Sequence, residues 1–161
     1  MKVKFFTTGG TIDKIYFDKK STYQVGAPKI VEILKGANVN FDYEVESILK
    51  KDSLDMTESD RKQLTTKIKK DKHERIIVTH GTDTMLATAR TLQTIPEKVI
   101  VLTGAMQPAS FAGSDAIFNV GAAIAAVQVL PFGVYIAMNG LILNPNNSIK
   151  NVAKSRFEHL R

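Results

Sequence analysis

Three apolar segments of the chain end in glycine, and in two of them a threonine follows the glycine. Residues 8–11 read Thr-Gly-Gly-Thr, residues 80–83 read His-Gly-Thr-Asp, and residues 103–106 read Thr-Gly-Ala-Met. A threonine hydroxyl is a poor nucleophile until a neighbouring group removes its proton. Backbone amides freed by glycine turns could stabilise the oxyanion of a tetrahedral intermediate. These residue types together indicate acyl transfer on an amide.

Several other kinds of catalytic site are excluded by the sequence. It has no cysteine, so it forms no disulfides, thiolate metal sites or cysteine nucleophiles. It contains no G-x-G-x-x-G dinucleotide motif, no G-x-x-x-x-G-K-[ST] phosphate loop and no G-x-S-x-G elbow. The histidines His73, His80 and His159 show no metal-ligand spacing, so we expect no metal site.

The base that would activate a threonine remains open at this point. His80 lies beside the candidate site and could accept a proton, but a histidine at the end of a buried strand is more often hydrogen-bonded scaffolding. A tyrosine or a lysine is the alternative. Lysine titrates at about 10.4 in water, so burial or a second cation must lower its pKa before it acts as a base. A lysine paired with aspartate would instead orient a hydroxyl and relay its proton.

Strand-like segments alternate with helix-like segments along the chain. We expect strands at residues 2–8, 41–49, 75–81, 98–104 and 132–140, the last turning into a short strand at 141–143. We expect helices at residues 28–37, 57–71, 82–94 and 114–130, and a last short helix at 150–160. Thr57 is the expected N-cap of the second helix, with Asp60 completing a capping box.

This alternation predicts an α/β fold, a three-layer sandwich with a mostly parallel, doubly wound sheet. Residues 1–161 form one expected domain, because the length suits a single core and the sequence shows no linker or repeat. Ligands of such sheets bind beyond the carboxyl ends of the strands. The glycine–threonine segments come at those ends, so the candidate site lies there.

Charge and hydropathy limit the possible partners and location. The formal net charge is +6, and much of the excess lies in residues 50–72. A solvated lysine-rich helix face explains it more simply than nucleic-acid binding or steering of an anionic substrate, because no recognition motif is present. The longest apolar stretch, 120–138, contains a proline and a glycine, and the apolar run near the amino terminus is too short for a signal peptide. We expect a cytoplasmic protein with no nucleic-acid or membrane partner.

Five ordered motifs resemble those of the bacterial-type L-asparaginases. They are TTGGTI at 7–12, STYQVG at 21–26, DSLDM at 52–56, VTHGTDTM at 78–85 and LTGAMQP at 102–108. They occur in the order of the family and at similar spacings, from residue 3 to about residue 155. The resemblance implies hydrolysis of L-asparagine to L-aspartate and ammonia, with L-glutamine accepted by some members and without a cofactor.

The resemblance also implies catalytic roles for individual residues. Thr11 matches the primary nucleophile of the family, on a mobile loop that closes over the substrate. Tyr23 matches the tyrosine that partners this nucleophile. Thr82 and Asp83 match the second threonine and its aspartate, and Lys150 falls at the position of the family's lysine.

Substrate-binding roles follow from the same motifs. Ser53 matches a residue that binds the α-carboxylate of the substrate, and Asp83 matches one that also contacts its α-ammonium group. Thr82 belongs to the same binding set. Gly10 and Gly81 match positions of close backbone approach, next to amides that bind the oxyanion.

Each of these residues also has a structural interpretation. Thr11 and Tyr23 could simply end a strand and pack against neighbours, and Ser53 could cap a turn. Thr82 could be the N-cap of the helix expected at 82–94, followed by an aspartate that favours the helix dipole. Lys150 could be a solvated lysine in a polar tail.

The sequence departs from the family in two respects. Typical members have a second, carboxy-terminal domain that closes a dimer and reaches into the partner's active site, and these 161 residues include no such domain. Leu54 stands where many members have a glutamine that helps to hold the amino group. Loss of a contact to a charged group could cost about 2–3 kcal/mol, so we expect activity with weak substrate affinity.

Three functions remain open on this basis. The first is an amidohydrolase whose partner is a small-molecule substrate, L-asparagine or also L-glutamine. The second is a non-catalytic sensor of asparagine or aspartate, and the third is a subunit of an amidotransferase. We also expect a homo-oligomer, because apolar residues nearly encircle the helix expected at 114–130.

Overall fold

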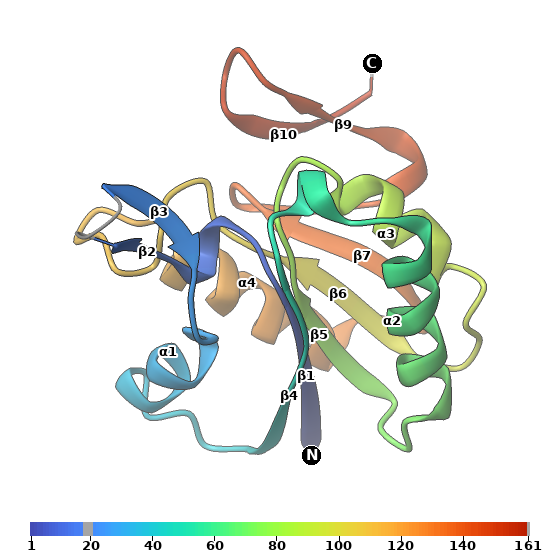
Figure 1. Cartoon of the computed structure of the whole chain (residues 1–161). Coiled ribbons are helices and arrows are strands. Elements are labelled where there is room, and N and C mark those ends of the chain that lie inside the picture. The colour runs from blue at the N-terminus through green and yellow to red at the C-terminus, as the bar shows by residue number, and fades with distance from the viewer. Residues whose placement is uncertain (18–20, 161) are drawn as a thin grey trace.

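A six-stranded sheet forms the centre of the computed structural model, which describes residues 1–17 and 21–160 (Figure 1). Its strands stand in the order β4-β1-β5-β6-β7-β8. The first five run parallel, and β8 pairs antiparallel with β7. The bounds are β1 Lys2–Gly9, β4 Asp42–Lys51, β5 Arg75–Thr79, β6 Val99–Thr103, β7 Gly133–Met138 and β8 Leu141–Leu143. The predicted mostly parallel sheet is therefore confirmed.

In the described part of the chain, α-helices cover both faces of this sheet (Figure 1). Helices α1 (Ile30–Gly36) and α4 (Ala116–Val129) pack on one face, and α2 (Glu58–Lys70) and α3 (Met85–Leu92) on the other. Adjacent residues of a strand point to opposite faces. Phe5 thus packs in the core under α1 and α4, and Phe6 packs under α2 and α3. The result is the predicted three-layer sandwich.

The helix starts agree with the sequence in one case and differ in another. Helix α2 begins with the predicted capping box, in which Thr57 N lies 2.8 Å from Asp60 Oδ2 and Asp60 N lies 3.2 Å from Thr57 Oγ1. Helix α3 begins later than expected, with Thr84 as its N-cap. Thr82 is therefore not the N-cap, and it is available for other contacts.

Two hairpins lie beyond the carboxyl ends of the parallel strands (Figure 1). One joins β2 (Lys14–Phe17) to β3 (Thr22–Val25), and the other joins β9 (Ser148–Asn151) to β10 (Arg156–His159). The helix predicted at 150–160 is wrong, because this segment forms the second hairpin. In its turn, Asn151 Oδ1 accepts a hydrogen bond from Lys154 N at 3.1 Å, and Ser155 has a φ of 47° that no α-helix allows.

In the part of the chain that the structure describes, two short 3₁₀ turns carry candidate site residues, and a third precedes β9. They are η1 Thr11–Asp13, η3 Ser53–Asp55 and η4 Pro145–Asn147. None of the helices within the described residues has the length and apolar character needed to span a membrane.

Candidate active site

Close backbone contacts bring segments together at the carboxyl ends of β1 and β5. Gly10, with a φ of 90°, follows β1, and a Cβ atom there would overlap the backbone of Gly81. A Cβ atom at Gly81 would lie 2.6 Å from the Cβ of Ser53 in η3. Glycine is therefore required at both positions, and it lets the segments that carry Thr11, Thr82 and Ser53 lie side by side at one edge of the sheet.

Replacement of Gly10 by alanine should lower the free energy of unfolding by about 2–4 kcal/mol, because the side chain is strained at this φ and overlaps Gly81. Gly36, at the end of α1, is the matched control, since a Cβ atom there meets nothing within 4 Å. Gly36→Ala should change stability by less than about 1 kcal/mol. Urea unfolding measures both, and an unchanged midpoint for Gly10→Ala would show that the backbones are not so closely packed.

The β9–β10 hairpin carries Lys150 to the Thr82–Asp83 segment. Lys150 Nζ lies 2.8 Å from Thr82 Oγ1 and 2.5 Å from Asp83 Oδ1. Thr82 is buried, and only 15% of the Lys150 side chain is exposed. Lys150 is therefore not a solvated tail residue. Because its ammonium group donates to the Thr82 oxygen, the hydroxyl proton of Thr82 can point to another acceptor.

Ser53 connects η3 to the loop before α3. Its buried hydroxyl oxygen lies 3.2 Å from Asp83 N and 3.4 Å from Thr84 N. Thr84 Oγ1 donates to the Ser53 carbonyl at 2.8 Å. Both contacts of the Ser53 hydroxyl use its lone pairs, so the group can still donate its own proton. The next residue, Leu54, is 72% exposed and has no polar group to offer a ligand.

Thr11 and Tyr23 lie on the same side of the molecule but are not bonded to each other. Thr11 is half-buried in η1, which directly follows Gly10. Tyr23 lies in β3, is 50% exposed, and has its ring centroid 5.4 Å from that of Tyr16 and 6.0 Å from that of Phe111. Within the described residues, which include both, no hydrogen bond joins the Thr11 hydroxyl to Tyr23. The structure thus joins Ser53, Thr82, Asp83 and Lys150 by hydrogen bonds. It places Thr11 next to the Gly10–Gly81 contact, without a bond to Tyr23.

Two charged residues at the base of the β2–β3 hairpin belong to this region although the sequence did not indicate them. Asp13 is buried, and its Oδ1 accepts a hydrogen bond from Lys29 N at 2.8 Å. Burial raises the pKa of Asp13 to about 6. Lys14 Nζ lies 2.6 Å from Oδ2 of Asp52, the N-cap of η3. The signal that could have identified them is their position, two and three residues after Thr11. Their contacts with Lys29 and Asp52 fix the base of the hairpin.

His80 is scaffolding of the site rather than its base. Its Nδ1 donates to the Gly81 carbonyl at 2.7 Å, and its Nε2 lies 2.8 Å from Thr88 Oγ1. The side chain is fully buried, and desolvation lowers its pKa to about 4. Because both ring nitrogens have partners, His80 holds the end of β5 against α3 instead of accepting a substrate proton.

The lowered pKa of His80 makes stability depend on pH. As the pH is lowered from 6.5 to about 4, the contribution of His80 to the free energy of unfolding should fall by about 3 kcal/mol. The unfolded chain takes up this proton at the ordinary pKa of 6.5, whereas the folded protein resists protonation until about pH 4, so protons favour unfolding in that range. Urea unfolding of the wild type and His80→Gln at several pH values isolates this contribution. Identical pH slopes for the two proteins would contradict it.

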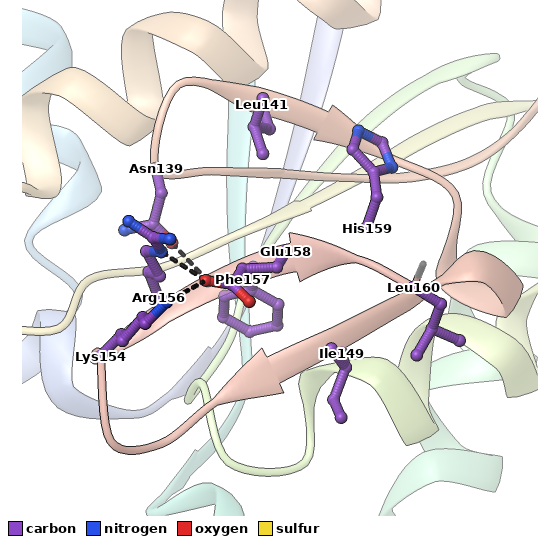
Figure 2. A pocket seen from close by; sticks show the side chains of 9 residues that line it. All are labelled: Asn139, Leu141, Ile149, Lys154, Arg156, Phe157, Glu158, His159 and Leu160. Atoms are coloured by element: carbon purple, nitrogen blue, oxygen red, sulfur yellow. Dashed lines mark hydrogen bonds and ion pairs between the residues drawn. The ribbon is translucent and has the colours of Figure 1, made fainter.

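A pocket of about 710 Å³ lies elsewhere, on the β9–β10 hairpin (Figure 2). It is lined by Asn139, Leu141, Ile149, Lys154, Arg156, Phe157, Glu158, His159 and Leu160. None of these is a predicted site residue. Within the described residues, no group of metal-ligating side chains of the size needed to hold an ion is found. We therefore place the candidate site where the segments after β1, β4 and β5 contact one another and Lys150, and not in this pocket.

Known proteins resemble this chain in sequence. Residues 2–159 match the family model described as Asparaginase, N-terminal. L-asparaginase 2 of Escherichia coli is 29% identical in an alignment of 159 positions, which covers 92% of this chain and 46% of that protein. One subunit of the glutamyl-tRNA(Gln) amidotransferase of Methanococcus vannielii is 41% identical over 71 residues, 43% of this chain and 17% of that protein.

Solved structures show the same architecture. The thermostable L-asparaginase from Thermococcus kodakarensis has a TM-score of 0.86 at 25% identity and covers 99% of this chain. The probable cytoplasmic L-asparaginase from Campylobacter jejuni has a TM-score of 0.77 at 29% identity and covers 98%. The match takes in 51% of each of those chains, so this chain spans about half of their length. By the match over residues 2–159, the chain belongs to the asparaginase family.

Proposed function

We propose that this chain, as one α/β domain, hydrolyses L-asparagine to L-aspartate and ammonia with Thr11 as the nucleophile. The observation that carries the proposal is the contact of Lys150 with Thr82 and Asp83. This contact lies next to the close approach of Gly10 and Gly81, and Thr11 directly follows Gly10. Family membership and the likeness to L-asparaginases support the choice of substrate.

The proposed reaction has two steps. The Thr11 oxygen attacks the carboxamide carbon, and its proton is relayed through Tyr23 to the leaving nitrogen. The carbon–nitrogen bond then breaks, ammonia departs, and an aspartyl ester is left on Thr11. Water then cleaves the ester, returning the proton to Thr11. Thr82, oriented by Lys150 and Asp83, guides that water and the proton relay. Tyr23 must approach Thr11 for this, so the β2–β3 hairpin has to close when substrate binds.

The same site offers groups for both ends of the amino acid. The Ser53 hydroxyl can donate to the α-carboxylate, and the Asp83 carboxylate can accept from the α-ammonium group. Exposed Leu54 cannot add a polar contact. We therefore expect weak affinity for L-asparagine and only modest discrimination against L-glutamine. The proposed reaction needs no cofactor.

Assembly and location are part of the same proposal. The outward face of α4 is free of charge and exposes Ile117, Phe118 and Val129. We propose that this face joins copies of the chain into a homo-oligomer, and a clean monomer in sedimentation at tens of micromolar would refute it. A cytoplasmic location is supported by the likeness to the Campylobacter jejuni protein, which is described as a probable cytoplasmic L-asparaginase. We propose no nucleic-acid or membrane partner.

An amidotransferase subunit is the second candidate function. The match to the glutamyl-tRNA(Gln) amidotransferase of Methanococcus vannielii favours it, although only 43% of this chain takes part. In that case ammonia from the same site would serve a second protein's substrate rather than be released.

One assay tests these functions against each other. Purified protein is incubated with L-asparagine, L-glutamine and a small aliphatic amide, and ammonia is measured. Faster release from L-asparagine than from the small amide supports the hydrolase. No release, together with calorimetric binding of L-aspartate, would instead support a sensor. Release that appears only with a co-purified partner would support the amidotransferase function.

A further inference from the structure

Asn139 connects the sheet to the hairpin that carries Lys150. It follows β7, and with Gly140 it forms the turn to β8, at φ values of 54° and 78°. Its Oδ1 accepts a hydrogen bond from Phe157 N in β10 at 2.9 Å, and both residues can be followed in Figure 2. The Asn139 side chain therefore bonds to the backbone of a strand outside the main sheet.

Asn139 is itself held by a second amide side chain. Its backbone N–H donates to Asn119 Oδ1 at 3.1 Å, and Asn119 is fully buried in α4. Asn119 Nδ2 donates in turn to the Gly104 carbonyl at 3.1 Å and to Asp115 Oδ2 at 2.8 Å. A continuous series of hydrogen bonds thus runs from the end of β6, through α4 and the β7–β8 turn, to β10.

The register of the hairpin links this series to Lys150. Phe157 stands directly opposite Lys150 in the antiparallel β9–β10 ladder, and opposite residues place their side chains on the same face. The Phe157 ring is fully buried in the core on the side of the sheet that α2 and α3 cover. A fixed Phe157 therefore sets the face and the height at which Lys150 leaves the hairpin towards Thr82.

We propose that Asn139 is a positioning residue for Lys150, acting through the backbone of Phe157. The inference rests on the proposed function. The position needs a side-chain acceptor and a positive φ, which asparagine and aspartate supply together, whereas glycine supplies only the second. Other bonds hold the ends of the hairpin, since Arg90 Nε donates to the Pro145 carbonyl and Leu160 N donates to the Asn147 carbonyl, each at 3.0 Å. Loss of the Asn139 acceptor should therefore loosen the hairpin without unfolding the protein.

Steady-state kinetics of two variants test the proposal. Asn139→Gly should lower kcat for ammonia release by about tenfold or more with KM changed by less than about threefold, because a misplaced catalytic group slows the chemical step. Asn139→Asp keeps the acceptor and should stay within about threefold of the wild type in kcat. In a Lys150→Met background, Asn139→Gly should cause no further loss. Equal losses in the two Asn139 variants, or additive losses with Lys150→Met, would overturn the proposal.

A chemical readout separates this inference from the proposed function. Limiting acetylation by an N-hydroxysuccinimide ester, read by mass spectrometry, compares Lys150 with Lys154, whose side chain is 59% exposed on the same hairpin. In Asn139→Gly, labelling of Lys150 relative to Lys154 should rise severalfold, and in Asn139→Asp it should not. If the wild type releases no ammonia, the proposed function fails, and the labelling ratio alone decides the positioning role. An unchanged ratio in Asn139→Gly would overturn it.

Discussion

Thr11→Val should reduce kcat for ammonia release from L-asparagine on the order of a thousandfold or more, with binding of L-aspartate retained. Valine matches the shape of threonine but has no hydroxyl, so no ester can form. Attack by water on the bound amide is then assisted only by substrate binding, the amides around Gly10 and Gly81, and the Thr82 group. Ammonia release gives the rate, and calorimetry with L-aspartate shows that the site is still formed.

Two variants control this result. Thr11→Ser keeps the nucleophilic oxygen and should retain activity within about a hundredfold of the wild type. Thr66→Val makes the same substitution at an exposed position of α2, where the hydroxyl bonds to the Lys62 carbonyl. Its rate should equal that of the wild type. A Thr11→Val protein that is folded and as fast as Thr66→Val would remove Thr11 from the mechanism.

Lys150→Met should lower kcat by about a hundredfold or more, the size expected when a group that guides proton transfer is lost. Methionine fills similar space but takes the donor away from Thr82 Oγ1 and leaves Asp83 without the cation 2.5 Å from its carboxylate. Lys154→Met is the matched control on the same hairpin and should stay within about twofold of the wild type. A folded Lys150→Met protein with an unchanged kcat would show that the contact with Thr82 is not used in catalysis.

Much of the fold was accessible from the sequence because local pattern and final packing agree. The continuous apolar runs around Phe5 and Ile77 became buried parallel strands, and the Thr57–Asp60 capping box starts α2 as expected. The glycine–threonine segments were placed correctly at the carboxyl ends of the strands, because Gly10 and Gly81 are needed there for close backbone contact.

The carboxy-terminal hairpin could not be predicted from local pattern. Residues 150–160 have helix-forming side chains. In the structure, however, Phe157 is buried in the core and the Asn151 side chain accepts a hydrogen bond that closes a turn. Tertiary packing therefore overrides the local helix preference. The placement of Lys150 beside Thr82 followed from family resemblance alone, since it depends on hydrogen bonds at Asn139 and Pro145 that no short pattern encodes. Asp13 was missed because its burial depends on packing against the start of α1.

A crystal structure with L-aspartate bound at high concentration would test the central claim, that Thr11 and Thr82 act on one carboxamide, most directly. We expect the ligand's side-chain carboxylate between the hydroxyls of Thr11 and Thr82, with its α-carboxylate on Ser53 and the β2–β3 hairpin closed over it. L-aspartate bound in the hairpin pocket of Figure 2 instead would show that the two threonines do not form one site. The two hydroxyls pointing away from each other around an empty strand edge would show the same.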